Sequence, residues 1–170
     1  MKRRLTLFLA CAAAVLVLDQ VTKALVAGRL VLGVPVPVLG DFVRLTLVHN
    51  RGAAFGLFPG SRVPFIIVSI LAIAVVLYLF ARDAYRSAPA RVLLGSILGG
   101  ALGNLIDRAR LGYVIDFIEV GVGSLRWPVF NVADSAVTLG VIILAWNLAR
   151  QGRHASAPAE DSHGSPVAGG

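Results

Sequence analysis

Two aspartates, Asp116 and Asp134, have the residue type and the surroundings for acid–base catalysis. Asp134 lies near the start of the apolar run FNVADSAVTLGVIILAW, where an ionised carboxylate is costly unless it has a partner or a function. Asp116 lies in YVIDFIEV between apolar neighbours, an unusual place for a solvated loop charge. Two carboxylates that share a partly dry site cannot both ionise easily, so one keeps a proton. Such a pair supplies a base to activate water and an acid to protonate a leaving amine, which is the chemistry of aspartic peptidases.

The elements that would position these residues are predicted to be transmembrane helices. The chain of 170 residues is 57% hydrophobic and 15% charged, with a mean hydropathy of +0.81, and a soluble domain usually needs more surface charge. Apolar residues come in four blocks, and about 20 helical residues cross the hydrocarbon core. We therefore predict one domain over residues 1–150, with helices at about 5–27, 62–81, 90–108 and 131–150.

The segments between these blocks indicate a small sheet. Pro35 and Pro37 argue against helix in the long loop, and DFVRLTLVHN, from Asp41 to Asn50, reads as a strand. The predicted fold class is therefore a membrane all-α protein with four transmembrane helices, a small extracytoplasmic β-sheet at about 30–60 and a short surface helix between 107 and 130. The tail, residues 151–170, is rich in Ala, Pro, Gly and Ser, and we expect it to be disordered.

The distribution of basic residues predicts the orientation of the chain. Lysine and arginine crowd into short segments at 2–4 and 82–91, as expected of cytoplasmic segments. Both termini are therefore predicted to be cytoplasmic. The net charge of +7 suits membrane lipids with anionic headgroups, and nothing in the sequence requires a nucleic acid partner.

On this topology the polar residues of the apolar blocks gather at the outer side of the membrane, which predicts one polar site there. Besides the two aspartates, this group contains Asp19, Lys23, Asn50, Asn104, Asp107, Arg108 and Asn131.

Structural interpretations of single residues remain open. Asp134 follows Asn131 at the spacing of a helix-capping pair. Asp19 and Lys23, one helical turn apart, can neutralise each other. Asn104 can join helices packed through glycines, and Asp107 and Arg108 can be ordinary interfacial charges. No histidine is accompanied by other potential metal ligands at the spacing of a metal site, so neither a metal nor another cofactor is expected.

Five motifs occur in order: LDQVTK (18–23), NRGAAFG (50–56), GGALGNLIDR (99–108), VIDFI (114–118) and FNVADS (130–135). Together they closely resemble lipoprotein signal peptidase, also called signal peptidase II, over roughly residues 5–150. The resemblance implies an aspartic endopeptidase of the bacterial inner membrane that cuts prolipoproteins just before a diacylglyceryl-modified cysteine.

The resemblance also implies roles for residues. Asp116 and Asp134 would be the catalytic pair. Asn50, Gly100, Asn104, Arg108 and Asn131 would line the site, with Asp19 and Lys23 in support. It further implies that the sheet cradles the substrate, that the short helix of the last outer loop acts as a lid, and that cyclic peptides such as globomycin inhibit the enzyme. We expect the enzyme to be monomeric.

Two other classes of function are compatible with four helices and buried charges. A proton-coupled transporter would place its ionisable group near the bilayer midplane, whereas here the polar groups crowd one side. A non-catalytic assembly subunit would use the polar cluster to bind a partner.

Overall fold

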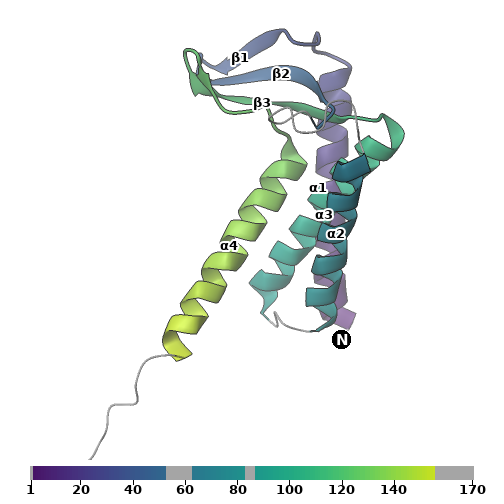
Figure 1. Cartoon of the computed structure of the whole chain (residues 1–170), viewed down its shortest axis with the longest axis vertical. Helices are drawn as coiled ribbons and strands as arrows, with labels where there is room; N and C mark the ends of the chain where they lie inside the picture. The colour runs from purple at the N-terminus through teal and green to yellow at the C-terminus, as the bar shows by residue number, and fades with distance from the viewer. Residues whose placement is uncertain (1, 53–62, 83–86, 156–170) are drawn as a thin grey trace, which may run out of the picture.

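The computed structural model describes residues 2–52, 63–82 and 87–155, in which a helical bundle carries a sheet at one end (Figure 1). The helices are α1 (Lys2–Ala27), α2 (Val63–Ala81), α3 (Ala88–Arg110) and α4 (Val132–Ala155). The first three are long and apolar enough to cross a membrane, and α4 has a shorter apolar part, Val132–Asn147. The predicted disordered tail lies mostly outside the described residues, since α4 continues to Ala155.

Helix α3 lies at the centre of the bundle and packs against α1, α2 and α4. Its start is set by Ser87, whose hydroxyl accepts a hydrogen bond from Ala90 N at 3.3 Å, and by a proline in the first turn. Gly112 follows its C-terminal end with φ of 82°, and its N–H returns to Arg108 O at 3.2 Å. Helix α3 therefore ends abruptly, and the chain turns directly into the sheet.

Glycines let the helices approach α3 closely. A Cβ atom at Gly100 would lie 2.5 Å from Ala133 O of α4. A Cβ at Gly99 would collide with Ala12 O of α1 on the other side. Gly100, which was expected to line the site, allows α3 and α4 to come into contact.

The sheet is antiparallel, with the strand order β1 (Pro35–Leu39), β2 (Val43–Asn50), β3 (Val114–Val122) and β4 (Leu125–Arg126). The strand expected at 41–50 is present as β2. The short surface helix expected between 107 and 130 is wrong, because residues 111–131 form β3 and β4 and contain no helix. The β-branched and aromatic run of β3 is typical of a strand, and it pairs along its length with β2.

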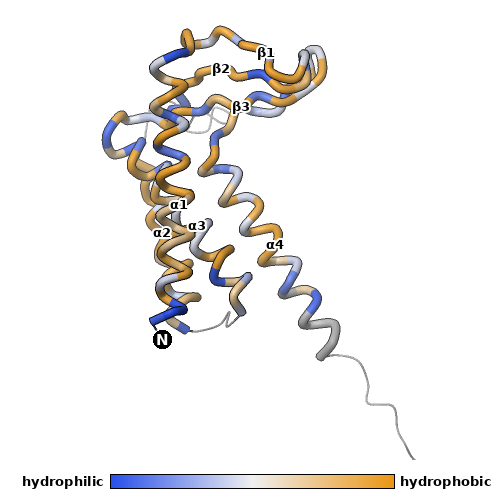
Figure 2. The backbone as a smooth tube through the Cα atoms, turned by 180° about the vertical axis from the view of Figure 1, so that it is seen from behind, coloured by the Kyte–Doolittle hydropathy of each residue, from blue (hydrophilic) through white to orange (hydrophobic). Residues whose placement is uncertain are grey.

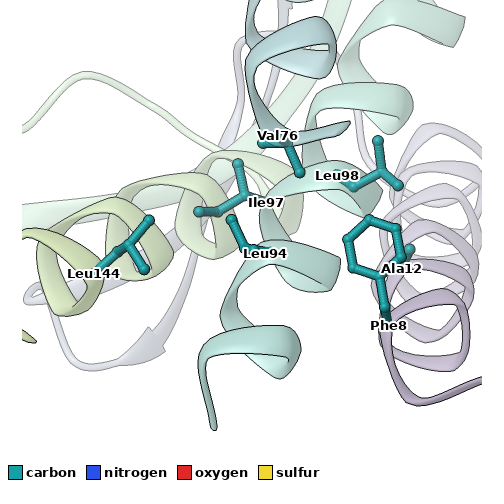
Figure 3. Close-up of a cluster of buried hydrophobic side chains, with 7 residues drawn as sticks. All are labelled: Phe8, Ala12, Val76, Leu94, Ile97, Leu98 and Leu144. Carbon is teal, nitrogen blue, oxygen red and sulfur yellow. The ribbon is translucent and has the colours of Figure 1, made fainter. Parts of the chain in front are cut away.

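The bundle is chemically divided along its length. At the end away from the sheet, α1, α2, α3 and α4 share a core of Phe8, Ala12, Val76, Leu94, Ile97, Leu98 and Leu144 (Figure 3). Phe8 stacks on Phe80 with ring centroids 4.1 Å apart. Apart from Arg91, near the start of α3, the buried charged and amide side chains lie at the sheet end, where α1, α3, α4 and β3 meet.

Candidate active site

The two predicted catalytic aspartates meet through Asn131. Asn131 is fully buried, and its Nδ2 donates to Asp116 Oδ1 at 2.7 Å. Its Oδ1 accepts from Asp134 N at 2.9 Å, and its own N–H donates to Asp134 Oδ2 at 3.3 Å. Asn131 is therefore the N-cap of α4, and Asp134 completes a capping box. The side chain of Asn131 also holds the carboxylate of Asp116, on β3, next to Asp134.

Asp116 receives one amide donor on each oxygen. Asn50 Nδ2 donates to Asp116 Oδ2 at 2.8 Å, and Asn131 Nδ2 donates to Asp116 Oδ1. Gly52 N donates to Asn50 Oδ1 at 2.8 Å, which turns the amide nitrogen of Asn50 toward Asp116. Strand register explains the contact, because Asn50 and Asp116 lie on paired strands two positions apart.

Burial raises the pKa of Asp116 to about 7. The negative charge of Asp134 raises it as well, while the hydrogen bonds from Asn50 and Asn131 and the charge of Lys23 lower it. Asp116 is 1% exposed, so removal from water is the dominant effect. Asp116 is therefore a carboxyl group that can hold a proton near neutral pH.

The side chain of Asp134 is oriented by Asn104 of α3. Asn104 Nδ2 donates to Asp134 Oδ1 at 2.7 Å, while Asn104 Oδ1 accepts from Lys23 Nζ at 2.9 Å. Lysine can only donate, so Lys23 fixes which end of the Asn104 amide faces Asp134. Asn104 is thus a donor of the site as well as a link between helices.

Lys23 is held between two buried carboxylates. Its Nζ lies 2.8 Å from Asp19 Oδ2 and 2.8 Å from Asp107 Oδ2. The predicted pairing of Asp19 with Lys23 is present, but the interpretation of Asp107 as an ordinary interfacial charge is wrong, since it is 3% exposed. Gln20 joins the same network by donating to Asp19 and to Asp107.

This network also fixes backbone at the site. Asp19 Oδ1 accepts from Ala133 N in the first turn of α4 at 3.0 Å. Asp107 Oδ2 accepts from Ile115 N, next to Asp116, at 3.2 Å. The three charged residues therefore position the two chain segments that carry the aspartates.

Arg108 lies on the α2 side of Asp134. Its Nη1 lies 3.4 Å from Ser69 Oγ, and its guanidinium lies 5.6 Å from the centre of the Phe65 ring. Arg108, Asn104 and Asp134 line a cavity of about 200 Å³ between α2, α3 and α4. The Arg108 guanidinium thus lies near the aspartates, but within the described part of the chain it forms no ion pair with either of them.

A second hollow, of about 460 Å³, lies on the other side of Asp134. Its walls are mostly apolar and include Val120, Trp127, Phe130 and Leu139. Asp134 is therefore accessible from two hollows, one partly polar and one apolar. No cluster of His, Cys, Asp or Glu able to hold a metal ion occurs among residues 2–52, 63–82 and 87–155.

Comparisons with known proteins agree on one family. The family model described as signal peptidase (SPase) II matches residues 11–150. The chain is 44% identical over 146 residues to the lipoprotein signal peptidase of Moorella thermoacetica, covering 83% of this chain and 91% of the relative. It is 43% identical over 139 residues to that of Desulforapulum autotrophicum, covering 79% and 86%.

Two solved structures share the fold of this chain. One bacterial membrane enzyme superposes with a TM-score of 0.80 at 33% identity, covering 90% of this chain and 93% of that one. A second, also described as a bacterial membrane enzyme, gives 0.76 at 35% identity, covering 83% and 91%.

Proposed function

The chain belongs to the signal peptidase II family of membrane peptidases, and from this premise we propose that it removes the signal peptide from diacylglyceryl-modified bacterial prolipoproteins, just before the lipidated cysteine. The observation that carries the proposal is the joint attachment of Asp116 and Asp134 to Asn131. That arrangement puts two carboxyl groups with different surroundings at one place, as acid–base hydrolysis requires.

The proposed reaction uses one carboxylate and one carboxylic acid. Asp134, at the positive end of the α4 dipole, is the carboxylate and takes a proton from water as the water attacks the scissile carbonyl carbon. Asp116, protonated near neutral pH, donates to the developing oxyanion. Collapse of the tetrahedral intermediate breaks the C–N bond, and the amine leaves with a proton from the aspartate pair.

The remaining site residues would hold the pair and the substrate. Asn50, Asn104 and Asn131 donate to the carboxylates. Lys23 would hold Asn104 in place, and Asp19 would hold Lys23 and the first turn of α4. Arg108, which has no carboxylate partner among the described residues, is placed to bind a carbonyl or lipid-proximal group in the cavity that it lines.

We further propose that α4 is the fourth span and that both termini are cytoplasmic. Its shorter apolar part crosses with the help of flanking residues or local thinning of the bilayer. The aspartates then lie near the outer leaflet of the bacterial inner membrane, where the lipid chains of a substrate can remain in the bilayer. We also propose that the enzyme acts as a monomer and is inhibited by globomycin-type cyclic peptides.

Cleavage of a lipidated prolipoprotein peptide by the purified protein tests this function. We expect wild-type protein to release the signal peptide, globomycin to block the release, and Asp116→Asn and Asp134→Asn to abolish it while remaining folded in detergent. Substantial cleavage by either folded variant would contradict the aspartate pair. Absence of cleavage by the wild type would favour a non-catalytic role.

A further inference from the structure

A hollow of about 240 Å³ lies between the sheet end of α1 and β2, apart from the two hollows that border Asp134. Both views show α1 rising to the sheet, where the chain turns toward β1 (Figures 1 and 2). The lining residues of this hollow are Thr22, Leu25, Val26, Arg29, Leu30 and Leu45. Because neither aspartate lines it, the hollow is separate from the proposed active site.

The walls of this hollow are apolar except for Arg29 and Thr22. The Thr22 hydroxyl lies 2.7 Å from Leu18 O and 2.9 Å from Asp19 O, so its hydrogen is used within α1. No carboxylate occurs among the described lining residues. Arg29 is therefore the side chain that would donate to a polar ligand in the hollow.

Arg29 has no carboxylate partner in the described part of the chain. The arginines of the sheet differ, since Arg44 and Arg126 both bind Asp41. A guanidinium presents five N–H donors in a geometry that matches the oxygens of a phosphate group. Arg29 is exposed, so these donors are available to an anion from outside the chain.

The length of α1 places this hollow at the depth of lipid headgroups. Helix α1 has 26 residues, which gives a length of about 39 Å, whereas the hydrocarbon core of a bilayer is about 30 Å thick. Residues 2–4, at the start of α1, are all basic and remain at one interface. The last turn of α1 therefore emerges at the other interface, and Arg29 lies two residues beyond the end of the helix.

An apolar surface leads from the hollow toward the membrane interior. Leu18, Val21 and Leu25 are 54%, 49% and 46% exposed. Their spacings of three and four residues place them on one face of α1. Figure 2 shows that α1 is mostly apolar below the sheet, as a lipid-exposed span requires. Leu25 also lines the hollow, so an acyl chain along this face leads to a headgroup beside Arg29.

We propose that this hollow binds an anionic phospholipid, whose phosphate contacts Arg29 and whose glycerol and first acyl carbons contact Leu25, Leu30 and Leu45. The apolar walls favour a lipid over a free phosphate ion. A lipid with net negative charge is favoured over a zwitterionic one, because the ammonium of a zwitterionic headgroup finds no carboxylate among the described lining residues. This binding does not depend on the proposed peptidase reaction.

Native mass spectrometry of the full chain released from detergent tests the proposal. The protein is titrated with phosphatidylglycerol, which is anionic, and with phosphatidylcholine, which is zwitterionic, both with the same acyl chains. One arginine near an anionic headgroup is worth about fivefold in affinity. We therefore expect the first phosphatidylglycerol to bind about fivefold more tightly than the first phosphatidylcholine, and Arg29→Gln to abolish this preference.

Arg110→Gln is the matched control. It removes the same charge from another exposed arginine, at the end of α3 and outside the hollow, and should leave the preference unchanged. Both arginines are exposed, so both variants should fold, and equal Tm values in detergent check this.

Three results would overturn the proposal. Equal affinity of the wild type for the two lipids would show that the hollow does not select an anionic headgroup. Equal losses in Arg29→Gln and Arg110→Gln would show that the preference comes from the overall charge of the chain. Displacement of phosphatidylglycerol by an equal concentration of glycerol 3-phosphate would show a site for free phosphate groups and not for a lipid.

Discussion

Removing the side chain of Asn50 should move the alkaline limit of peptidase activity to higher pH. In the proposed reaction Asp116 must be protonated, so activity falls as pH rises through its pKa of about 7. The hydrogen bond from Asn50 Nδ2 stabilises the ionised form of Asp116 and lowers this pKa. Asn50→Ala removes that donor and should therefore keep Asp116 protonated to higher pH.

The expected size of the shift follows from the hydrogen bond. A hydrogen bond to a charged group contributes about 1.5–3 kcal/mol, and about 1.4 kcal/mol corresponds to one pKa unit. The full loss would shift the pKa by about 1–2 units. Water that enters the space left by Asn50 would replace part of the bond, so we expect a shift of about 1 unit.

Rates of cleavage measured from mildly acidic to alkaline pH test this expectation. The position of the alkaline limb is compared, not the height of the profile, because Asn50 also lies where substrate would bind. Asn147→Ala removes the same side chain from α4, outside the site, and should leave the limb unchanged. An alkaline limb that stays in place or moves to lower pH in Asn50→Ala would refute the assignment of Asp116 as the acid.

The other predictions concern stability. Lys23→Met leaves Asp19 and Asp107 buried without their cation, so we expect the free energy of unfolding to fall by about 3–5 kcal/mol. The Tm in detergent should fall with it and should be partly restored by adding Asp107→Asn. An unchanged Tm would contradict the network. The hydrogen bond from Arg44 holds the pKa of Glu119 below its ordinary value of 4.5, so its stabilisation is present above that pH and is lost as pH falls through the depressed pKa. Glu119→Gln should therefore have a lower Tm at neutral pH and a smaller fall of Tm in acid, and parallel Tm curves for the two proteins would count against this ion pair.

The helices were predictable because their signal is local. Long apolar blocks give spans by length and composition alone, as α1, α2 and α3 do. The surface helix was mispredicted because β3 depends on pairing with β2, a partner more than sixty residues earlier in the chain. Its β-branched residues were compatible with a strand, but only the register with β2 decides the matter.

The candidate site was predictable in its members but not in its connections. Polar residues in apolar blocks stand out in a sequence, which found Asp116, Asp134 and Asn131. Asp107 was placed in the polar group, but its ion pair with Lys23 was not predicted, because a charge at a helix end is usually solvated. Its spacing of three residues from Asn104 places both on one face of α3, and that signal could have assigned it to the buried group.

The capping and catalytic interpretations of Asp134 are compatible, because its two oxygens have different donors. Oδ2 accepts from the backbone of Asn131 and Oδ1 from the Asn104 amide, while both oxygens of Asp116 accept from amides. All four oxygens thus face donors, so an asparagine at either position brings an NH₂ group against an N–H. That conflict costs about 1–3 kcal/mol, so both variants should melt earlier than the wild type. A structural role alone would lower activity only with the folded fraction, whereas a catalytic role abolishes cleavage in protein that is still fully folded.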